Sequence, residues 1–190
     1  YRDSYFTRET KSNAHQANVV LDLTANKQHS FGISATIFVS PNKRFNNQAL
    51  SLNTNSQRQL DSTFTTSSAS SRNNCNLALN ATHTFSLANS ATQIVTQANY
   101  VTYSADREQG VETNYFFPNG QQLRNNDFNT SGSQDNTIFT GQIDLSAPLT
   151  SGAFDWGLKV SDITTSSAQE FFDQTAQGAV LNPNLSDGFR

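Results

Sequence analysis

The stretch Phe31-Gly-Ile-Ser-Ala-Thr-Ile-Phe-Val39 decides the fold, because its apolar side chains recur at every second residue. Alternation with a period of two is typical of a β-strand that has one apolar face. The preceding stretch, Ala17–Ala25, alternates in the same way, and the Asn-Lys-Gln-His segment at 26–29 between them has residues typical of a turn. We therefore predict a β-hairpin over residues 14–41.

The same arrangement recurs twice along the chain. Leu77 and Leu79 share one face of a second predicted hairpin, over residues 73–105, and Ile143 lies on the apolar face of a third, over residues 135–165. Helix signals are nearly absent from the sequence. The predicted fold class is therefore all-β, with a long antiparallel meander.

The lengths of the strands and of their connections indicate a membrane protein. The alternating runs are about 11 to 14 residues long, whereas strands of soluble proteins average about 5 to 6 and a tilted membrane-spanning strand needs about 9 to 11. The strands within each hairpin are joined by short turns, but the predicted loops 42–72, 106–134 and 166–188 are long. Long loops of this kind are uncommon in compact soluble domains. Short periplasmic turns and long extracellular loops are typical of outer-membrane β-barrels.

One short helix, Ser166–Ala176, is the only helical segment that the residues allow, and it falls in the last predicted loop. The six clear strands would leave two long unpaired edges, which lipid does not tolerate. We therefore interpret residues 1–190 as a segment of one β-barrel domain that forms a partial barrel. An eight-stranded barrel, with strands from both termini, stays open.

The composition agrees with this interpretation. Only 14% of the residues are charged, and 81 of the 190 are Asn, Ser, Thr or Gln. Neutral polar side chains of this kind suit a water-filled lumen and outer loops, while the alternate residues form an apolar face toward lipid. The 12 basic and 15 acidic residues provide no positive field for nucleic acid. No apolar run reaches the ~20 residues of a membrane helix.

Aromatic residues near the short turns support a membrane interface at that end of the strands. The residues concerned are Phe31, Phe85, Phe154 and Trp156. Aromatic girdles mark both interfaces of outer-membrane barrels, so we expect these four side chains at the periplasmic interface. Cys75 is the only cysteine, and its place in an alternating run predicts a small apolar side chain on one strand face.

Two hairpins resemble a known family. Leu21-Asp-Leu-Thr-Ala-Asn-Lys-Gln-His-Ser-Phe-Gly-Ile-Ser-Ala35 is similar to a strand–turn–strand unit of Bacteroidetes outer-membrane β-barrel proteins related to TonB-dependent receptors. Gln142-Ile-Asp-Leu-Ser-Ala-Pro-Leu-Thr-Ser-Gly-Ala-Phe-Asp-Trp-Gly-Leu-Lys-Val160 resembles a later hairpin of that family. The resemblance implies a large barrel in the cell outer membrane, with outer-membrane lipid, TonB and an extracellular ligand as partners of the parent protein. It also implies a plug domain and a TonB-contact segment, and neither is visible in this chain.

No residue pattern indicates catalysis, a metal ion or a cofactor. His15, His29 and His83 lack the spacing of metal ligands, and we expect His29 to be a solvated turn residue. Asp127–Gly132 matches the start of a calcium loop, but Ile138 occupies the position that needs a bidentate Glu. A flexible loop tip is the better interpretation of that segment. We therefore expect no enzymatic activity, no catalytic residues, no metal and no cofactor.

The predicted loops carry two further groups of residues. The acidic group, expected to be solvated, is Asp106, Glu108, Glu112, Glu170 and Asp173. The aromatic group is Tyr115, Phe116, Phe117, Phe171 and Phe172. The aromatic side chains either fold the loops onto one another or bind a ligand at the barrel mouth.

These patterns lead to two hypotheses of function. The first is an outer-membrane β-barrel segment of a TonB-dependent receptor-like transporter, which takes up a ligand across the outer membrane. The second is a soluble or surface-attached β-sandwich that binds carbohydrate or protein through long polar loops.

Overall fold

The computed structural model describes residues 1–175 and 177–189, which form one sheet of nine strands. The strands are β1 (Arg2–Lys11), β2 (His15–Thr24), β3 (His29–Thr54), β4 (Leu60–Ser86), β5 (Gln93–Phe116), β6 (Gln122–Leu149), β7 (Gly152–Thr175), β8 (Gly178–Leu181) and β9 (Asp187–Phe189). Among the described residues, no helix has the length and apolar character needed to cross a membrane.

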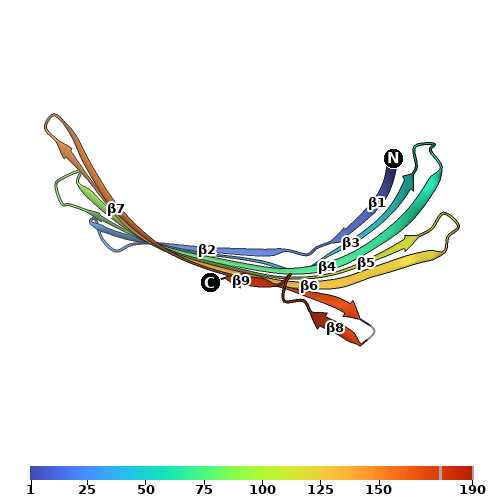
Figure 1. Cartoon of the computed structure of the whole chain (residues 1–190). Coiled ribbons are helices and arrows are strands. Elements are labelled where there is room, and N and C mark those ends of the chain that lie inside the picture. Colours follow the sequence, from blue (N-terminus) through green and yellow to red (C-terminus); the bar gives the residue numbers. More distant parts are fainter. Residues whose placement is uncertain (176, 190) are drawn as a thin grey trace.

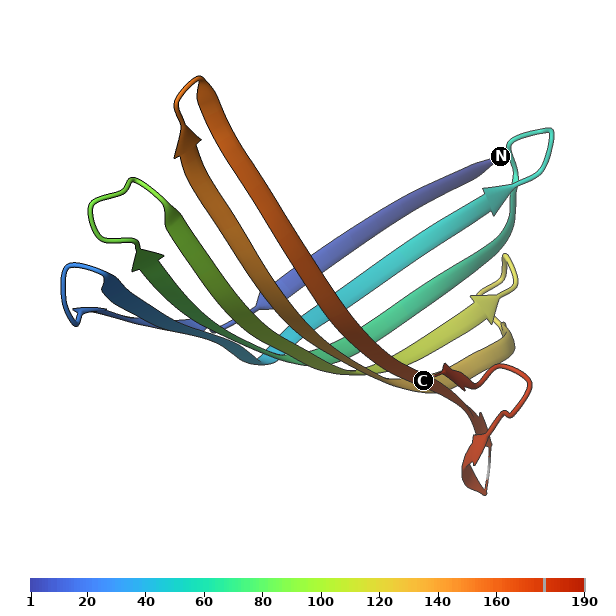
Figure 2. The ribbon, with the colours of Figure 1, turned by 90° about the vertical axis from the view of Figure 1, so that its left-hand side faces the viewer.

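The sheet is a single curved layer in which all paired strands run antiparallel (Figure 1). Strands β3 to β7 follow one another in order across the sheet, as Figure 2 shows. At one edge, β1 and β2 both pair with β3, each along half of its length, and at the other edge β8 and β9 both pair with β7. The strand order and the antiparallel pairing confirm the predicted meander. The sheet is not closed within the described residues, where it forms an open wall.

The two faces of the sheet differ in polarity. In one row of paired residues, Ala35, Leu79, Tyr100 and Phe139 occupy facing positions on β3, β4, β5 and β6 and therefore project to the same side. Exposed apolar side chains gather on that face, including Ile33 at 55% and Leu158 at 54% exposure, far above what a soluble core would allow. The next residues along each strand, which project to the opposite side, are mostly Asn, Gln, Ser and Thr.

Burial shows which face is the inside of the curve. Five residues of the described chain are buried: Ser40, Ser51, Ala105, Thr113 and Thr140. The pairing register places all five on the polar face. Side chains on the inside of a curved sheet crowd one another, whereas those on the outside spread apart. We call the polar face, which holds these five side chains, the inner face and the opposite one the outer face.

The apolar stretch of the outer face is inclined to the rows of paired residues. On β3 it runs from Phe31 to Val39, centred on Ala35, and the row through Ala35 reaches Asp162 on β7. On β7, however, the apolar stretch is centred on Gly157, five residues from Asp162. Five residues span about 17 Å along a strand, and the four strand spacings from β3 to β7 span about 19 Å across the sheet. The apolar band is therefore inclined by about 40° to the rows of paired residues. Strands of membrane barrels have a tilt of this size, about 35–45°.

The predicted interfacial aromatics lie at one end of this band. Phe31, Phe85, Phe154 and Trp156 all project from the outer face next to the turns 25–28, 87–92 and 150–151, which we call the near end of the sheet. This placement is the one that the sequence predicts for an aromatic girdle. The opposite end, with the turns 55–59 and 117–121, is called the far end.

The prediction of long loops is wrong. Apart from the short turns 55–59 and 117–121, residues 42–72, 106–134 and 166–175 continue the strands instead, so that β3 to β7 are 24 to 28 residues long and far exceed the membrane-spanning length. Both faces of these extensions are polar, and a strand without an apolar face has no period of two to recognise. The extensions are held by ladders of backbone hydrogen bonds between neighbouring strands of similar length. Such pairing depends on the whole sheet and cannot be read from the sequence of one segment. The described part of the predicted helix Ser166–Ala176 lies in β7 for the same reason, and its last residue falls outside the described residues.

A break in two neighbouring strands marks the boundary between the apolar band and the extensions. Strand β3 has a bulge between Ser40 and Lys43, where Asn42 adopts a positive φ of 52°, and residues 12–14 interrupt the neighbouring edge between β1 and β2. The Asn42 amide donates to Asn73 Oδ1 (2.7 Å) and the Ser40 hydroxyl donates to the Asn13 carbonyl (3.0 Å). The bulge adds an unpaired residue, so odd-numbered residues of β3 face outward before it and inward after it.

The two faces predict opposite responses to a new charge. Ile143 lies at the centre of the outer apolar stretch of β6, and its neighbour Gln142 projects inward and donates to Asp144 (2.7 Å). Ile143→Arg should lower the free energy of unfolding of the protein in phospholipid vesicles by about 2–4 kcal/mol, because the charge enters the bilayer midplane. Gln142→Arg should be mild, since it meets water and a carboxylate. Denaturant titrations of the full-length protein in vesicles measure both, and equal losses would contradict the assigned faces.

The single cysteine provides a second test of the faces. Cys75 projects from the outer face, whereas the neighbouring Asn76 projects inward. In vesicles, a charged, membrane-impermeant maleimide should label Cys75 slowly and should label the variant Cys75→Ser/Asn76→Cys quickly, because only the second thiol meets water. Labelling in detergent-free vesicles followed by mass spectrometry checks this. Faster labelling of Cys75 than of the variant would reverse the assignment.

Candidate functional site: the inner face

Between the near-end turns and the level of the β3 bulge, the inner face is a network of short polar side chains. Asn80 donates to Ser34 Oγ (3.1 Å) across β4 and β3, and the hydroxyls of Thr140 and Ser161 lie 3.2 Å apart across β6 and β7. Alternation along the strands brings these groups to one side, and pairing between strands brings them within reach of each other. This part of the wall is hydrophilic with few charges.

Beyond the β3 bulge, the inner face becomes basic. The register places six cationic side chains there, on β1, β3, β4, β5 and β6: Arg2, Arg8, Lys43, Arg72, Arg107 and Arg124. Asp173 and Asp187 are the acidic residues that the register of the described strands places on the same part of this face. This surface is called the basic wall below.

Three of these cations occupy directly facing positions. Lys43 pairs with Arg72, and Arg72 pairs with Arg107, so that β3, β4 and β5 each contribute one positive charge to one row, which we call the cation row. The row continues through Gly132 and Gln169 and ends at Asp187. Asp187 lies three strands from Arg107, about 14 Å away.

Neutral groups hold the cation row in place. The Arg72 guanidinium donates to the Tyr103 hydroxyl (2.7 Å) and to Asn74 Oδ1 (2.8 Å). Arg107 donates to Gln109 Oε1 (2.7 Å), and the Lys43 ammonium lies 5.2 Å from the centroid of the Phe45 ring. These contacts orient the side chains without neutralising them.

Toward the far end, cations alternate with aromatic rings. Arg2 lies over the ring of Phe64 (4.6 Å), Phe64 packs against Tyr115 (5.5 Å between centroids), and Arg124 lies over Tyr115 (4.1 Å). The four residues come from β1, β4, β5 and β6, so this ladder crosses most of the sheet. Cation–π contacts of this kind contribute about 0.5–1 kcal/mol each at exposed sites and fix the position of a charge.

The outer face of the extensions has the opposite charge. Eight acidic residues project from it: Asp3, Glu9, Asp106, Glu108, Glu112, Asp127, Asp135 and Glu170. Lys11 and Arg44 are the two basic residues that the register places there. Within the described residues, one ion pair lies closer than 4.0 Å, between Lys11 and Glu9 on this outer face (3.1 Å).

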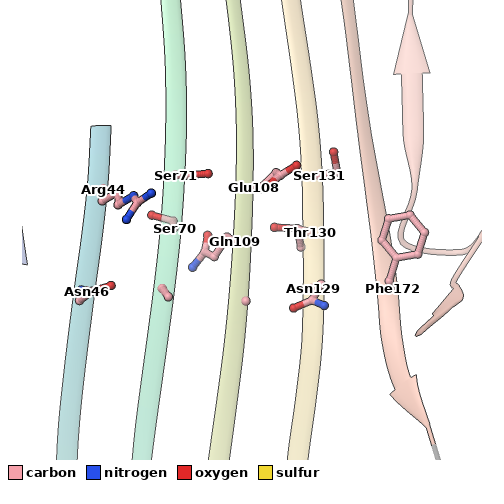
Figure 3. A pocket seen from close by; sticks show the side chains of 12 residues that line it. Arg44, Asn46, Ser70, Ser71, Glu108, Gln109, Asn129, Thr130, Ser131 and Phe172 are labelled. Carbon is pink, nitrogen blue, oxygen red and sulfur yellow. The ribbon is translucent and has the colours of Figure 1, made fainter. Parts of the chain in front are cut away.

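A surface groove of about 590 Å³ crosses the acidic outer face. Figure 3 shows Arg44, Ser71, Glu108 and Ser131 at one level on four neighbouring strands, with Phe172 at the β7 side. The groove is lined by side chains of mixed charge and opens away from the inner face. We therefore assign it no part in the inner wall.

The structure places the members of the predicted acidic and aromatic groups on different faces of the sheet. Of the acidic group, Asp106, Glu108, Glu112 and Glu170 lie on the outer face and Asp173 on the inner one. Of the aromatic group, Tyr115 and Phe171 project inward, Phe116 and Phe172 outward, and Phe117 lies in a turn. Phe171 stacks on Phe128 of the neighbouring strand (4.7 Å), so these rings pack within the sheet and do not join separate loops.

The histidines are partly brought together. His15 stays apart, but His29 and His83 stack with their rings parallel, and Nδ1 of His29 lies 3.0 Å from Nε2 of His83. His29 is the first residue of β3 and not a turn residue, which corrects the prediction. Sequence spacing could not show this contact, because the two residues are 54 positions apart and meet only through the β3–β4 register.

The calcium-like segment Asp127–Gly132 forms part of the extended strand β6. Its Asp, Asn and Ser side chains project from the outer face about 7 Å apart along the strand and form no loop that could enclose an ion, so the expected loop tip is wrong. In the described part of the chain, no group of three or more His, Cys, Asp or Glu side chains is placed to hold a metal ion. The six cations of the basic wall were not recognised from the sequence.

A comparison with protein families decides where this wall belongs. Residues 87–190, more than half of the chain, match the Outer membrane protein beta-barrel family. The chain belongs to this family. A search of curated proteins finds no match.

Membership places the chain in the outer membrane, with lipid against its outer face. The apolar band of that face, its tilt and its aromatic residues are what lipid requires of such a barrel wall. The match begins in the turn before β5 and continues through β9, and the same band extends over β2, β3 and β4 in the unmatched half.

The contact between Arg72 and Tyr103 can be tested against a matched control. Tyr103→Phe removes the hydroxyl that accepts from Arg72, so we expect a loss of about 0.5–1.5 kcal/mol in the free energy of unfolding. Tyr100 lies three residues away on the outer face of the same strand. Tyr100→Phe should change stability little, since that ring meets lipid. Urea titration in vesicles measures both variants, and a larger loss for Tyr100→Phe would contradict the assigned contact.

Proposed function

We propose that the chain forms part of the wall of a TonB-dependent receptor-like transporter, which takes up a ligand across the outer membrane. The observation that carries the proposal is the continuous polar inner face behind an apolar outer band. A wall of this kind separates a water-filled passage from lipid. The receptor-like part rests on the resemblance of the two hairpins around 21–35 and 142–160.

The open sheet supports a barrel with further strands. The edge of β7 from Gly152 to Ser166 has no partner among the described residues, although it carries the apolar band. Unpaired backbone groups in hydrocarbon cost several kcal/mol each, so this edge needs a neighbouring strand in the membrane. Strand β9 already pairs with Ser167–Gln169, directly beyond that edge.

The extensions support capture of the ligand on one side of the membrane. Outer-membrane barrels have short periplasmic turns and longer extracellular segments. We therefore assign the near end to the periplasm and the far end, with the basic wall, to the outside. The strands continue from the membrane and hold their inward side chains in a fixed array where a ligand would arrive.

We propose no enzymatic role, since the inner face offers polar and charged side chains but no arranged acid, base or nucleophile among the described residues. The β-sandwich hypothesis has no support, because the described strands form one layer and a sandwich needs two packed sheets. The family match also places the chain in the outer membrane.

Uptake by intact cells tests the proposal. Cells with the full-length protein and cells in which it is deleted are given fluorescent dextran and dextran sulfate oligosaccharides of equal chain length. We expect at least one probe to accumulate faster in cells with the protein, and a protonophore to abolish the difference. Equal accumulation of both probes with and without the protein would contradict transport. Uptake that persists with the protonophore would contradict TonB dependence.

A further inference from the structure

The sheet sorts charge between its two faces beyond the apolar band. Six cations and two acidic residues lie on the inner side of the extensions, against eight acidic residues and two cations on the outer side. The chain as a whole has a net charge of −3, so its average charge hides a basic surface. Neighbouring residues show the sorting directly: Lys43 faces inward and Arg44 outward.

Repulsion between the positive charges of the cation row destabilises the folded sheet when no anion is bound. Like charges directly opposite one another on neighbouring strands destabilise the pairing. Lys43, Arg72 and Arg107 occupy three successive facing positions, and no acidic side chain lies within 4.0 Å of any of them in the described residues. The acidic residues of the outer face project away on the other side of the backbone. An anion on the inner side would remove this repulsion.

The cations of the row also keep unused donors. A guanidinium has five N–H donors and an ammonium three. Arg107 donates one hydrogen bond, to Gln109, and Arg72 donates two, to Tyr103 and Asn74. Gly132 follows Arg107 in the row, so the facing position on β6 contributes no side chain to the inner surface there. Oriented guanidinium groups with free donors bind carboxylate or sulfate well, because two parallel hydrogen bonds match the two oxygens.

The basic wall is too long for one small anion. The cation row includes Arg72 on β4, and the cation–aromatic ladder includes Phe64 on the same strand, eight residues away. Eight residues of strand span about 27 Å. Arg8 lies between these two levels and contacts Phe45 (4.9 Å), so positive charge continues along the wall. A ligand that uses the whole surface is therefore an extended chain with several negative groups.

We propose that the basic wall binds an extended acidic oligosaccharide, with its carboxylate or sulfate groups on the cation row and on the cations toward the far end. This inference rests on the proposed function, because it names the class of ligand that such a passage would take up. The alternating aromatic rings hold the cations apart at fixed positions, which suits a chain whose negative groups recur at intervals.

Direct binding tests the inference with charge-matched variants. Arg72→Gln/Arg107→Gln removes two positive charges from the inner face, and Lys11→Gln/Arg44→Gln removes two from the outer face of the neighbouring strands. The full-length protein in detergent micelles is titrated with dextran sulfate, with oligogalacturonate and with neutral dextran of equal length. The two acidic probes differ in whether they carry sulfate or carboxylate.

We expect binding of at least one acidic probe that weakens with salt, and no comparable binding of dextran. The inner variant should raise the Kd at least tenfold, while the outer variant should change it less than twofold. Equal effects of the two variants, or equal binding of dextran, would overturn the inference. If the cation row instead pairs with acidic groups elsewhere in the barrel, the inner variant should lower stability and leave the Kd unchanged, which would also overturn it.

Two measurements keep the result interpretable. Circular dichroism verifies that each variant is folded, and Arg107→Gln alone, at an exposed position, replaces the double variant if that one fails to fold. The uptake experiment separates this inference from the proposed function. Uptake of dextran and dextran sulfate at equal rates would leave transport intact and overturn the acidic ligand, whereas binding of dextran sulfate without uptake would overturn transport alone.

Discussion

The pairing of every backbone N–H and C=O with a neighbouring strand is the constraint on which this structure depends. Hydrocarbon offers no water to the backbone, so a sheet in lipid is stable only where strand pairs with strand. Strands β3 to β6 satisfy this condition on both sides through the band, and β7 satisfies it on the side of β6. The same ladders then continue for a comparable distance beyond the band. Because the pairing continues without regard to side-chain polarity, the extensions need no core of their own.

The tilt of the strands explains residues that otherwise look misplaced. His83 lies in the same row as Phe31 and Leu158, and Asp162 lies in the same row as Ala35 and Phe139. In an untilted sheet both would sit among apolar side chains at membrane depth. With an inclination of about 40°, His83 falls toward the near interface on β4 and Asp162 toward the far interface on β7. Both polar side chains then lie where the membrane meets water.

The sequence pattern predicted the strands that have an apolar face, but it missed the features that depend on pairing between strands. Alternation identified the three hairpins, the outward side of Leu79 and Ile143, and the aromatic residues near the turns. It could not identify the polar extensions, since Ser67 and Ser68 look alike although they project to opposite faces. The β3 bulge added a second obstacle. Counting every second residue onward from Val39 places Lys43 on the outer face, but the extra residue at 41–42 turns Lys43 inward and Arg44 outward.

That bulge also connects the fold to the proposed site. Without the extra residue, the register of the first half of β3 would continue, and Asn42 would face Arg72 in place of Lys43. Arg44 would then project inward opposite Ser70, while Phe45 would face outward and leave Arg8 without its aromatic contact. The bulge lies where the apolar band ends, so the same irregularity that ends the lipid-facing stretch of β3 also sets which of its cations face the lumen. This local feature, together with the unbroken alternation of β4, β5 and β6, gives the inner face a nearly neutral polar part toward the near end and the basic wall toward the far end. Any ligand entering from the far end would therefore meet the positive charges before it reached the membrane-spanning part of the passage.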